Sequence, residues 1–156
     1  MARAPHIHAV WASIALATAM AAGCADEGTE ESDYVERLNG AQERLLADVN
    51  ELSSGAGSVS SPGQASEVTG NLIGTVRSSA AEIEAIVPPA EVADHHAELA
   101  AVLRELEREL GAARRELASG NPNRIAAAAT EISDAGARSE RQADRAIERI
   151  NAELAG

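Results

Sequence analysis

The chain has 156 residues, and its 25 acidic residues against 13 arginines, with no lysine, give a formal net charge of −12 at pH 7. An acidic surface of this size disfavours binding to nucleic acid and electrostatic docking on anionic lipid, because both need basic side chains to meet phosphate groups. A single cysteine excludes an internal disulfide.

The N-terminal residues are typical of an export signal. Residues 1–8 contain Arg3 and no acid, and the fifteen residues from Ala9 to Gly23 carry no charge. A permanent transmembrane helix needs about 20 apolar residues to cross a hydrocarbon core about 30 Å thick, so this alanine-rich run is too short. We therefore expect residues 1–23 to be a signal peptide that is removed.

The apolar run ends in Ala21, Ala22, Gly23 and Cys24, which resemble the lipobox of bacterial lipoproteins, although leucine is usual where Ala21 stands. The resemblance implies cleavage between Gly23 and Cys24 and a diacylglycerol on the sulfur of Cys24. The alternative is ordinary signal-peptidase cleavage after Ala21, because Ala19 and Ala21 satisfy the A-x-A rule. That cleavage would leave a free thiol, which is a liability outside the cytoplasm.

We expect the mature protein, with 12 arginines against 25 acids, to be held by membrane lipid on the extracytoplasmic side of the cell membrane. Each buried methylene of two acyl chains contributes about 0.8 kcal/mol, whereas an anionic leaflet repels each nearby charge by about 1 kcal/mol. The lipid would therefore keep an acidic body at the membrane. Residues 24–32 are polar, acidic and aperiodic, which predicts a flexible tether before a domain that spans residues 33–156.

Helical periodicity predicts two helices in the first half of that domain. Apolar residues recur at steps of three and four, and residues 53–61 interrupt the pattern as a loop. Ser61, Pro62 and Gln64 fit an N-cap, a proline in the first turn and a capping-box partner. The first apolar face is Tyr34, Leu38, Ala41, Leu45, Val49 and Leu52, and the second is Val68, Leu72, Val76, Ala80, Ile83 and Val87.

Two more helices follow, because Pro88 and Pro89 end the second helix and start the third. Gly120, Asn121 and Pro122 fit a helix end, an N-cap and a first turn, which predicts a tight hairpin. Small residues line the middle of the fourth helix, so the bundle is either thin there or filled by leucines of the third. The third face is Val92, His96, Leu99, Leu103, Leu106, Leu110, Ala113 and Leu117, and the fourth is Ile125, Ala129, Ile132, Gly136, Ser139, Ala143, Ile147, Ile150 and Leu154.

Four amphipathic segments joined by short loops predict an all-α fold, an antiparallel up-down-up-down helical bundle, because each helix must bury its apolar face. Gly63, Gly70 and Gly74 each weaken the second helix by up to about 1 kcal/mol relative to alanine. Three helices with a loose first or second helix are the alternative. Long alanine-rich helices also permit a coiled-coil dimer, so an oligomer is allowed but not indicated.

The residues with candidate site chemistry are Glu91, His95, His96 and Glu98, near the start of the third helix. Glu91 and Glu98 lie four and three residues from His95, so each pair shares a helix face and offers oxygen and nitrogen ligands to a metal. Di-metal bundles draw such ligands from several helices, whereas the other predicted helices lack histidine. The preferred interpretation is therefore no metal and no cofactor. His96 then packs at the edge of the apolar face and bonds to a backbone carbonyl or a side chain of the second helix, and His95 faces water.

Nothing in the sequence indicates an enzyme. It contains no Gly-rich phosphate loop, no G-x-S-x-G motif and no nucleophilic Cys-His pair. Paired carboxylates such as Glu82 with Glu84 and Glu105 with Glu109 are typical of a solvated helical surface. We therefore expect a non-catalytic interaction or structural module whose partner is an envelope protein or a cell-wall component. The alternative is a lipoprotein that binds a metal or small ligand through the two adjacent histidines and nearby acids.

The second half of the chain carries a further resemblance. Pro88 and Pro89, followed by His96 and a leucine-rich helix, are similar to a pattern in small helical lipoproteins of high-GC bacteria. The similarity spans Ile86 to Leu154. It implies a helical extracytoplasmic domain and brings no activity and no catalytic residues.

Overall fold

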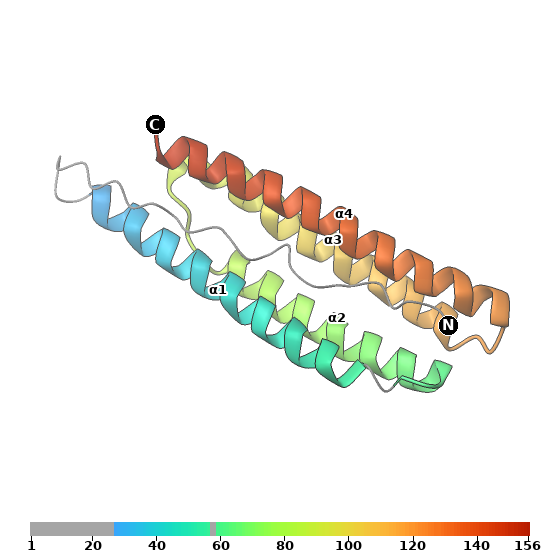
Figure 1. Cartoon of the computed structure of the whole chain (residues 1–156). Coiled ribbons are helices and arrows are strands. Elements are labelled where there is room, and N and C mark those ends of the chain that lie inside the picture. Colours follow the sequence, from blue (N-terminus) through green and yellow to red (C-terminus); the bar gives the residue numbers. More distant parts are fainter. Residues whose placement is uncertain (1–26, 57–58) are drawn as a thin grey trace.

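The computed structural model describes residues 27–56 and 59–156, and within these ranges it contains four long helices and no strand. The helices are α1 (Glu27–Ala56), α2 (Pro62–Glu84), α3 (Ala93–Leu117) and α4 (Pro122–Leu154), and a short 3₁₀ helix, η1 (Ala90–Val92), precedes α3. Successive helices run in opposite directions along an elongated bundle (Figure 1). The predicted all-α bundle is therefore confirmed.

Helix α1 begins earlier than the sequence pattern predicts. It starts at Glu27, so residues 27–32, which were expected to belong to a flexible tether, are helical instead. Glu30 and Glu31 favour this start, because carboxylates near a helix N-terminus interact well with the helix dipole. The prediction of a tether is thus wrong for residues 27–32, and residues 24–26 lie outside the described part of the chain.

Helix α2 starts with the cap that its sequence predicts. The Ser61 hydroxyl accepts a hydrogen bond from the backbone N–H of Gln64 at 3.3 Å, and Pro62 lies in the first turn. The Gln64 side chain reaches one residue further back than in a standard capping box, and its Oε1 accepts from the backbone N–H of Ser60 at 2.9 Å. The preceding loop is shorter than predicted, because α1 continues to Ala56.

The end of α2 differs from the prediction. The helix ends at Glu84, and Ile86 then turns inward to 7% exposure while Val87 is 82% exposed. Val87 was expected on the apolar face, and that expectation is wrong. The reason is Pro88, because a proline ring disfavours helical angles at the residue before it.

The hairpin between α3 and α4 has the predicted chemistry. Gly120 adopts a φ of +70°, the left-handed region in which glycine carries no Cβ penalty. The Asn121 side chain accepts hydrogen bonds from the backbone N–H groups of Asn123 and Arg124, at 3.0 and 3.3 Å. These bonds satisfy N–H groups that have no partner within the helix. Gly120 thus turns the chain after α3, and Asn121 caps the start of α4.

The first half of α4 turns a different face to the core than the sequence pattern predicts. Ala128 and Ala135 are buried, at 0% and 1% exposure, whereas Ala129 and Gly136 are exposed. The expectation that Ala129 and Gly136 face inward is therefore wrong. Residues 126–129 are all alanine, so hydrophobicity alone does not select which of them points inward.

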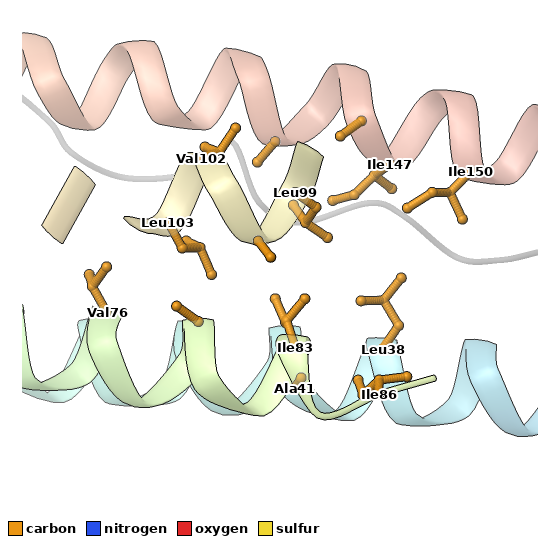
Figure 2. Close-up of a cluster of buried hydrophobic side chains, with 14 of the residues drawn as sticks. Leu38, Ala41, Val76, Ile83, Ile86, Leu99, Val102, Leu103, Ile147 and Ile150 are labelled. Carbon is orange, nitrogen blue, oxygen red and sulfur yellow. The ribbon is translucent and has the colours of Figure 1, made fainter. Parts of the chain in front are cut away.

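The main core lies where the first halves of α1 and α3 meet the second halves of α2 and α4. Figure 2 shows Ile83, Leu99 and Ile147 pointing into this cluster from α2, α3 and α4. Helix α3 packs against both α2 and α4, whereas α1 packs chiefly against α2. Four helices therefore share one core, but α1 is the least enclosed of them.

A smaller apolar cluster lies near the α3–α4 hairpin. Its buried members are Ala113 and Leu117 of α3 and Ala128 of α4, with Ala65 of α2 packed against them. Leu117 of α3 and Ala128 of α4 thus belong to the same cluster.

Candidate functional site

The predicted lipidation and cleavage residues, Cys24 and Gly23, lie outside the described residues. Their roles therefore stay predictions from the sequence. Within the described residues, none of the four helices is both long enough and apolar enough to cross a membrane.

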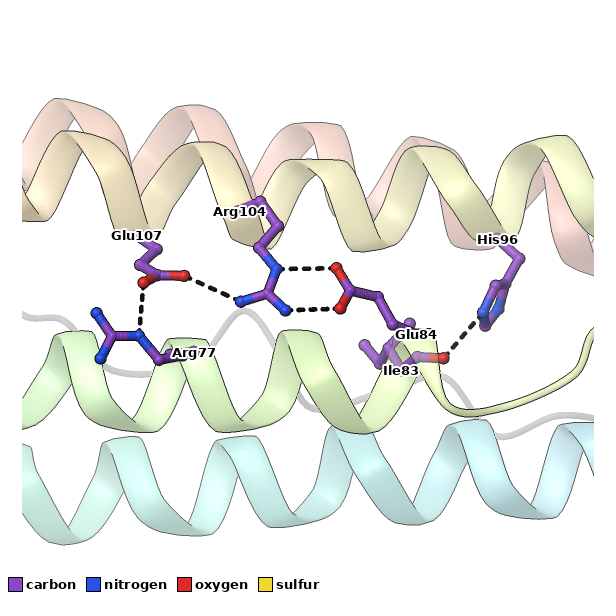
Figure 3. Close-up of polar contacts among 6 residues, drawn as sticks. All are labelled: Arg77, Ile83, Glu84, His96, Arg104 and Glu107. Atoms are coloured by element: carbon purple, nitrogen blue, oxygen red, sulfur yellow. Dashed lines mark hydrogen bonds and ion pairs between the residues drawn. The ribbon is translucent and has the colours of Figure 1, made fainter.

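The buried polar centre of the bundle is His96 on α3, which is 5% exposed. Its Nε2 lies 2.9 Å from the carbonyl oxygen of Ile83 on α2, as Figure 3 shows. Its Nδ1 lies 3.2 Å from the hydroxyl of Tyr34 on α1, and the two rings meet edge to face with centroids 5.7 Å apart. One imidazole therefore joins three helices at the main core.

These contacts define the proton positions on the ring. A carbonyl oxygen only accepts hydrogen bonds, so Nε2 of His96 must donate to Ile83. In the neutral ring Nδ1 then carries no proton and accepts from the Tyr34 hydroxyl. In the neutral ring that holds its proton on Nε2, both nitrogens and the proton of the Tyr34 hydroxyl therefore have partners.

Burial shifts the pKa of His96 and the pKa of Tyr34 in the directions that favour their neutral forms. Removal from water lowers the pKa of His96 below its ordinary value, and the hydrogen bond to Ile83 opposes that change only in part. Burial likewise raises the pKa of Tyr34 to about 12. The contact is therefore neutral on both sides at physiological pH.

The four candidate metal ligands do not converge. His96 faces Ile83 and Tyr34, whereas His95 lies 3.8 Å from Glu98 through its Nδ1. Glu91 is exposed, and Glu98 also accepts a hydrogen bond from Arg149. Among the residues that the structure describes, no group of three or more His, Cys, Asp or Glu side chains could hold a metal ion.

The orientation of His96 follows the preferred interpretation from the sequence, because its ring is packed and bonded to a backbone carbonyl of α2. His95 is half-buried rather than open to water. The sequence did not identify Tyr34 as the partner of His96, 62 positions away. The available signal was that the chain's one tyrosine lies on a predicted apolar face, where its hydroxyl needs a partner.

Arginine–carboxylate pairs join neighbouring helices along the surface. Figure 3 shows Arg104 of α3 held by Glu84 of α2 through two hydrogen bonds, 2.8 and 2.6 Å long. Glu107 of α3 accepts from Arg104 at 3.1 Å and from Arg77 of α2 at 2.6 Å. This four-residue network ties α2 to α3. Further interhelical pairs are Arg44–Glu82, Arg124–Glu116, Arg138–Glu109 and Arg149–Glu98.

The carboxylates that the sequence left as solvated pairs are held by arginines. Glu82 and Glu84 bond to arginines of α1 and α3, and Glu105 and Glu109 bond to Arg108 and to an arginine of α4. The hydrogen bond from its arginine lowers the pKa of Glu84 below its usual range. General acid catalysis near neutral pH needs a raised carboxyl pKa, so Glu84 is not suited to that role.

Comparison of the chain with protein-family models, with curated proteins and with solved structures found no match.

Proposed function

We propose that the chain is a lipid-anchored extracytoplasmic protein whose helical bundle is a non-catalytic interaction or structural module of the cell envelope. The observation that carries the proposal is the sequence Ala21-Ala22-Gly23-Cys24 at the end of a fifteen-residue uncharged run. The run directs export and the thiol accepts the lipid. The acidic body then needs an acyl anchor, because its charge does not attract it to anionic lipid.

The order of the helices supports a defined orientation at the membrane. After the proposed cleavage, the three residues from Cys24 to Asp26 would precede α1, and a chain of three residues can span at most about 10 Å. The N-terminal end of α1 lies at the same end of the bundle as the C-terminus and the α2–α3 connection (Figure 1). The main core would therefore stand near the membrane, and the Gly120 hairpin about 50 Å away, since α4 has 33 residues.

The surface of the bundle supports a binding role better than a catalytic one. Several of its described carboxylates pair with arginines of neighbouring helices, and both ring nitrogens of its buried histidine have partners within the fold. A rigid rod of paired helices presents long faces on which another envelope component could dock. The hairpin end, furthest from the proposed anchor, is the part best placed to reach such a partner.

Mass spectrometry of the mature N-terminus in the native host tests the anchor. The expected result is a first residue Cys24 with diacylglycerol on its sulfur, and membrane pelleting that Cys24→Ser abolishes. An unmodified N-terminus at Ala22 would overturn the proposal.

Crosslinking in native membranes tests the module, with Cys24→Ser as the mislocalised control. A partner crosslinked to the anchored chain and lost in the control is expected. No partner, together with no phenotype on deletion, would count against an interaction role.

A further inference from the structure

Helix α1 is the part of the bundle that can open at least cost. Its buried side chains, Tyr34, Leu38 and Ala41, all lie in its first half, and it packs chiefly against α2. In the second half, Leu45 and Val49 are only partly buried. Segments with few buried contacts open locally before the whole domain unfolds. The hydrogen bond between Tyr34 and His96 joins α1 to α3, and the ion pair between Arg44 and Glu82 joins α1 to α2.

Among the described side chains of α1 and α2, no charged group bonds to the ring of His96 to compensate a positive charge there. From α1 the ring meets Tyr34, which is neutral because burial raises its pKa to about 12. From α2 it meets the carbonyl of Ile83. Glu82 and Glu84 flank that residue, but each bonds to an arginine of another helix. A proton added to Nδ1 would therefore create a buried cation without a carboxylate.

The charged groups of α3 and α4 near this level are also engaged with one another. His95 lies beside Glu98, and Glu98 accepts a hydrogen bond from Arg149 of α4. Towards the core, α4 contributes the apolar side chains of Ile147 and Ile150. The surroundings of the buried ring thus penalise its cationic form from every helix that forms the core.

We propose that the contact between Tyr34 and His96 is an acid-sensitive latch, in which uptake of a second proton by His96 opens α1 from the other three helices. With α1 open, the Nδ1 edge of the ring faces water, which solvates the imidazolium. The bond between His96 and Ile83 joins α2 to α3 and does not involve α1, so it persists. The three remaining helices keep their shared core residues and stay packed.

The sign of the effect follows from proton linkage. The pKa of His96 is lowered when α1 is closed and returns towards its ordinary value of about 6.5 when α1 is open. The open state therefore binds more protons as the pH falls below about 6.5, and acid favours opening. Above that pH neither state is protonated, and the latch stays closed.

The latch does not depend on lipidation of Cys24. Its consequence for the anchored protein rests on the function proposed above. There α1 joins the anchor to the rest of the bundle, so opening would let α2, α3 and α4 move up to about 45 Å from their closed position, the length of α1.

Hydrogen exchange of the purified full chain, followed helix by helix at about pH 7.5 and about pH 5.5, tests the latch. This range lies above the ordinary carboxyl pKa values, so the ion pairs stay intact. After correction for the intrinsic exchange rates, the protection of residues 34–46 should fall at the lower pH. The fall can reach at most about tenfold for each pH unit by which the pKa of His96 in the open state exceeds its pKa in the closed state. The protection of α2, α3 and α4 should not change.

Two histidine variants give the matched comparison. In His96→Gln the amide can donate to Ile83 and accept from Tyr34 but does not titrate, so the acid response of α1 should vanish. His95→Gln removes the adjacent, half-buried histidine and should leave the response intact. Tyr34→Phe removes the donor to Nδ1, so the protection of α1 should already be low at about pH 7.5. Equal loss of protection in all four helices, no loss in α1, or a response that survives in His96→Gln would each overturn the proposal.

Discussion

The guanidinium of Arg114 on α3 lies directly over Gly70 on α2, so that a Cβ added to Gly70 would be 2.9 Å from Cζ of Arg114. Carbon atoms do not approach this closely without repulsion, so glycine provides the space for the arginine head. One turn further along α2, a Cβ added to Gly74 would meet no atom within 4 Å. The two glycines therefore offer the same substitution in crowded and in open surroundings.

Alanine at these glycines should have different effects. Gly74→Ala should raise the free energy of unfolding by about 0.5–1 kcal/mol, because alanine loses less backbone entropy in a helix. Gly70→Ala should gain less, since Arg114 must move to make room. Urea unfolding of both variants measures the difference. An equal gain would show that the Arg114 guanidinium moves aside without a measurable loss of stability.

The packing of α3 predicts a contrast between two leucines one turn apart. Leu110 is 1% exposed within the main core, whereas Leu106 is only partly buried at its edge. Leu110→Ala should cost about 2–5 kcal/mol, because it leaves a cavity that neighbouring side chains fill only in part. Leu106→Ala should cost less, since water can enter the space. Similar losses in chemical denaturation would contradict the core as described.

Local features of the fold could be predicted because they depend on neighbours in the chain. The Ser61 cap and the left-handed Gly120 follow from residues only a few positions apart. The burial of Ala128 in place of Ala129 could not be predicted, because adjacent alanines have equal hydrophobicity. The helix phase there is set by the shape of the partner surface on α3, which a single sequence does not specify.

The same distinction applies to the candidate site. A buried histidine at the edge of an apolar stripe needs a hydrogen-bond partner, so its bond to a backbone carbonyl was predictable in kind. The contact with its second partner, Tyr34, depends on the axial position of α1 relative to α3. That offset results from the packing of all four helices. The metal hypothesis placed Glu91, His95, His96 and Glu98 near the start of one helix, and it did not anticipate that Arg149 of α4 would bond to Glu98.

The network around Arg104 should give a geometric rather than a purely electrostatic contribution to stability. Arg104→Lys keeps the positive charge but cannot form both bonds to Glu84, so it should lower the melting temperature. The loss should change little at high salt, because lysine carries the same charge as arginine and screening acts on both side chains alike. Arg141→Gln, at an exposed position of α4, is the control and should change stability little. A lysine variant as stable as the parent would show that the paired hydrogen bonds from Arg104 to Glu84 do not contribute to stability.

Tyr34 predicts a loss of stability in alkali. Burial raises its pKa from 10.0 to about 12, so the folded chain holds the phenolic proton more tightly than the unfolded chain. Its contribution is therefore complete below pH 10 and falls as the pH rises from 10 to about 12, by at most about 3 kcal/mol. Since the chain has one tyrosine, the ultraviolet absorbance of the phenolate reports this group alone.

The titration should be compared in the folded protein and in denaturant. The folded chain should titrate near 12 and the unfolded chain near 10, and Tyr34→Phe should remove the part of the alkaline destabilisation that this group causes. Ionisation would place a phenolate beside the lone pair of Nδ1 on His96, where the hydrogen bond no longer has its proton. If the folded protein titrates near 10 while it stays folded, the Tyr34 hydroxyl faces water and the contact between α1 and α3 does not form in solution.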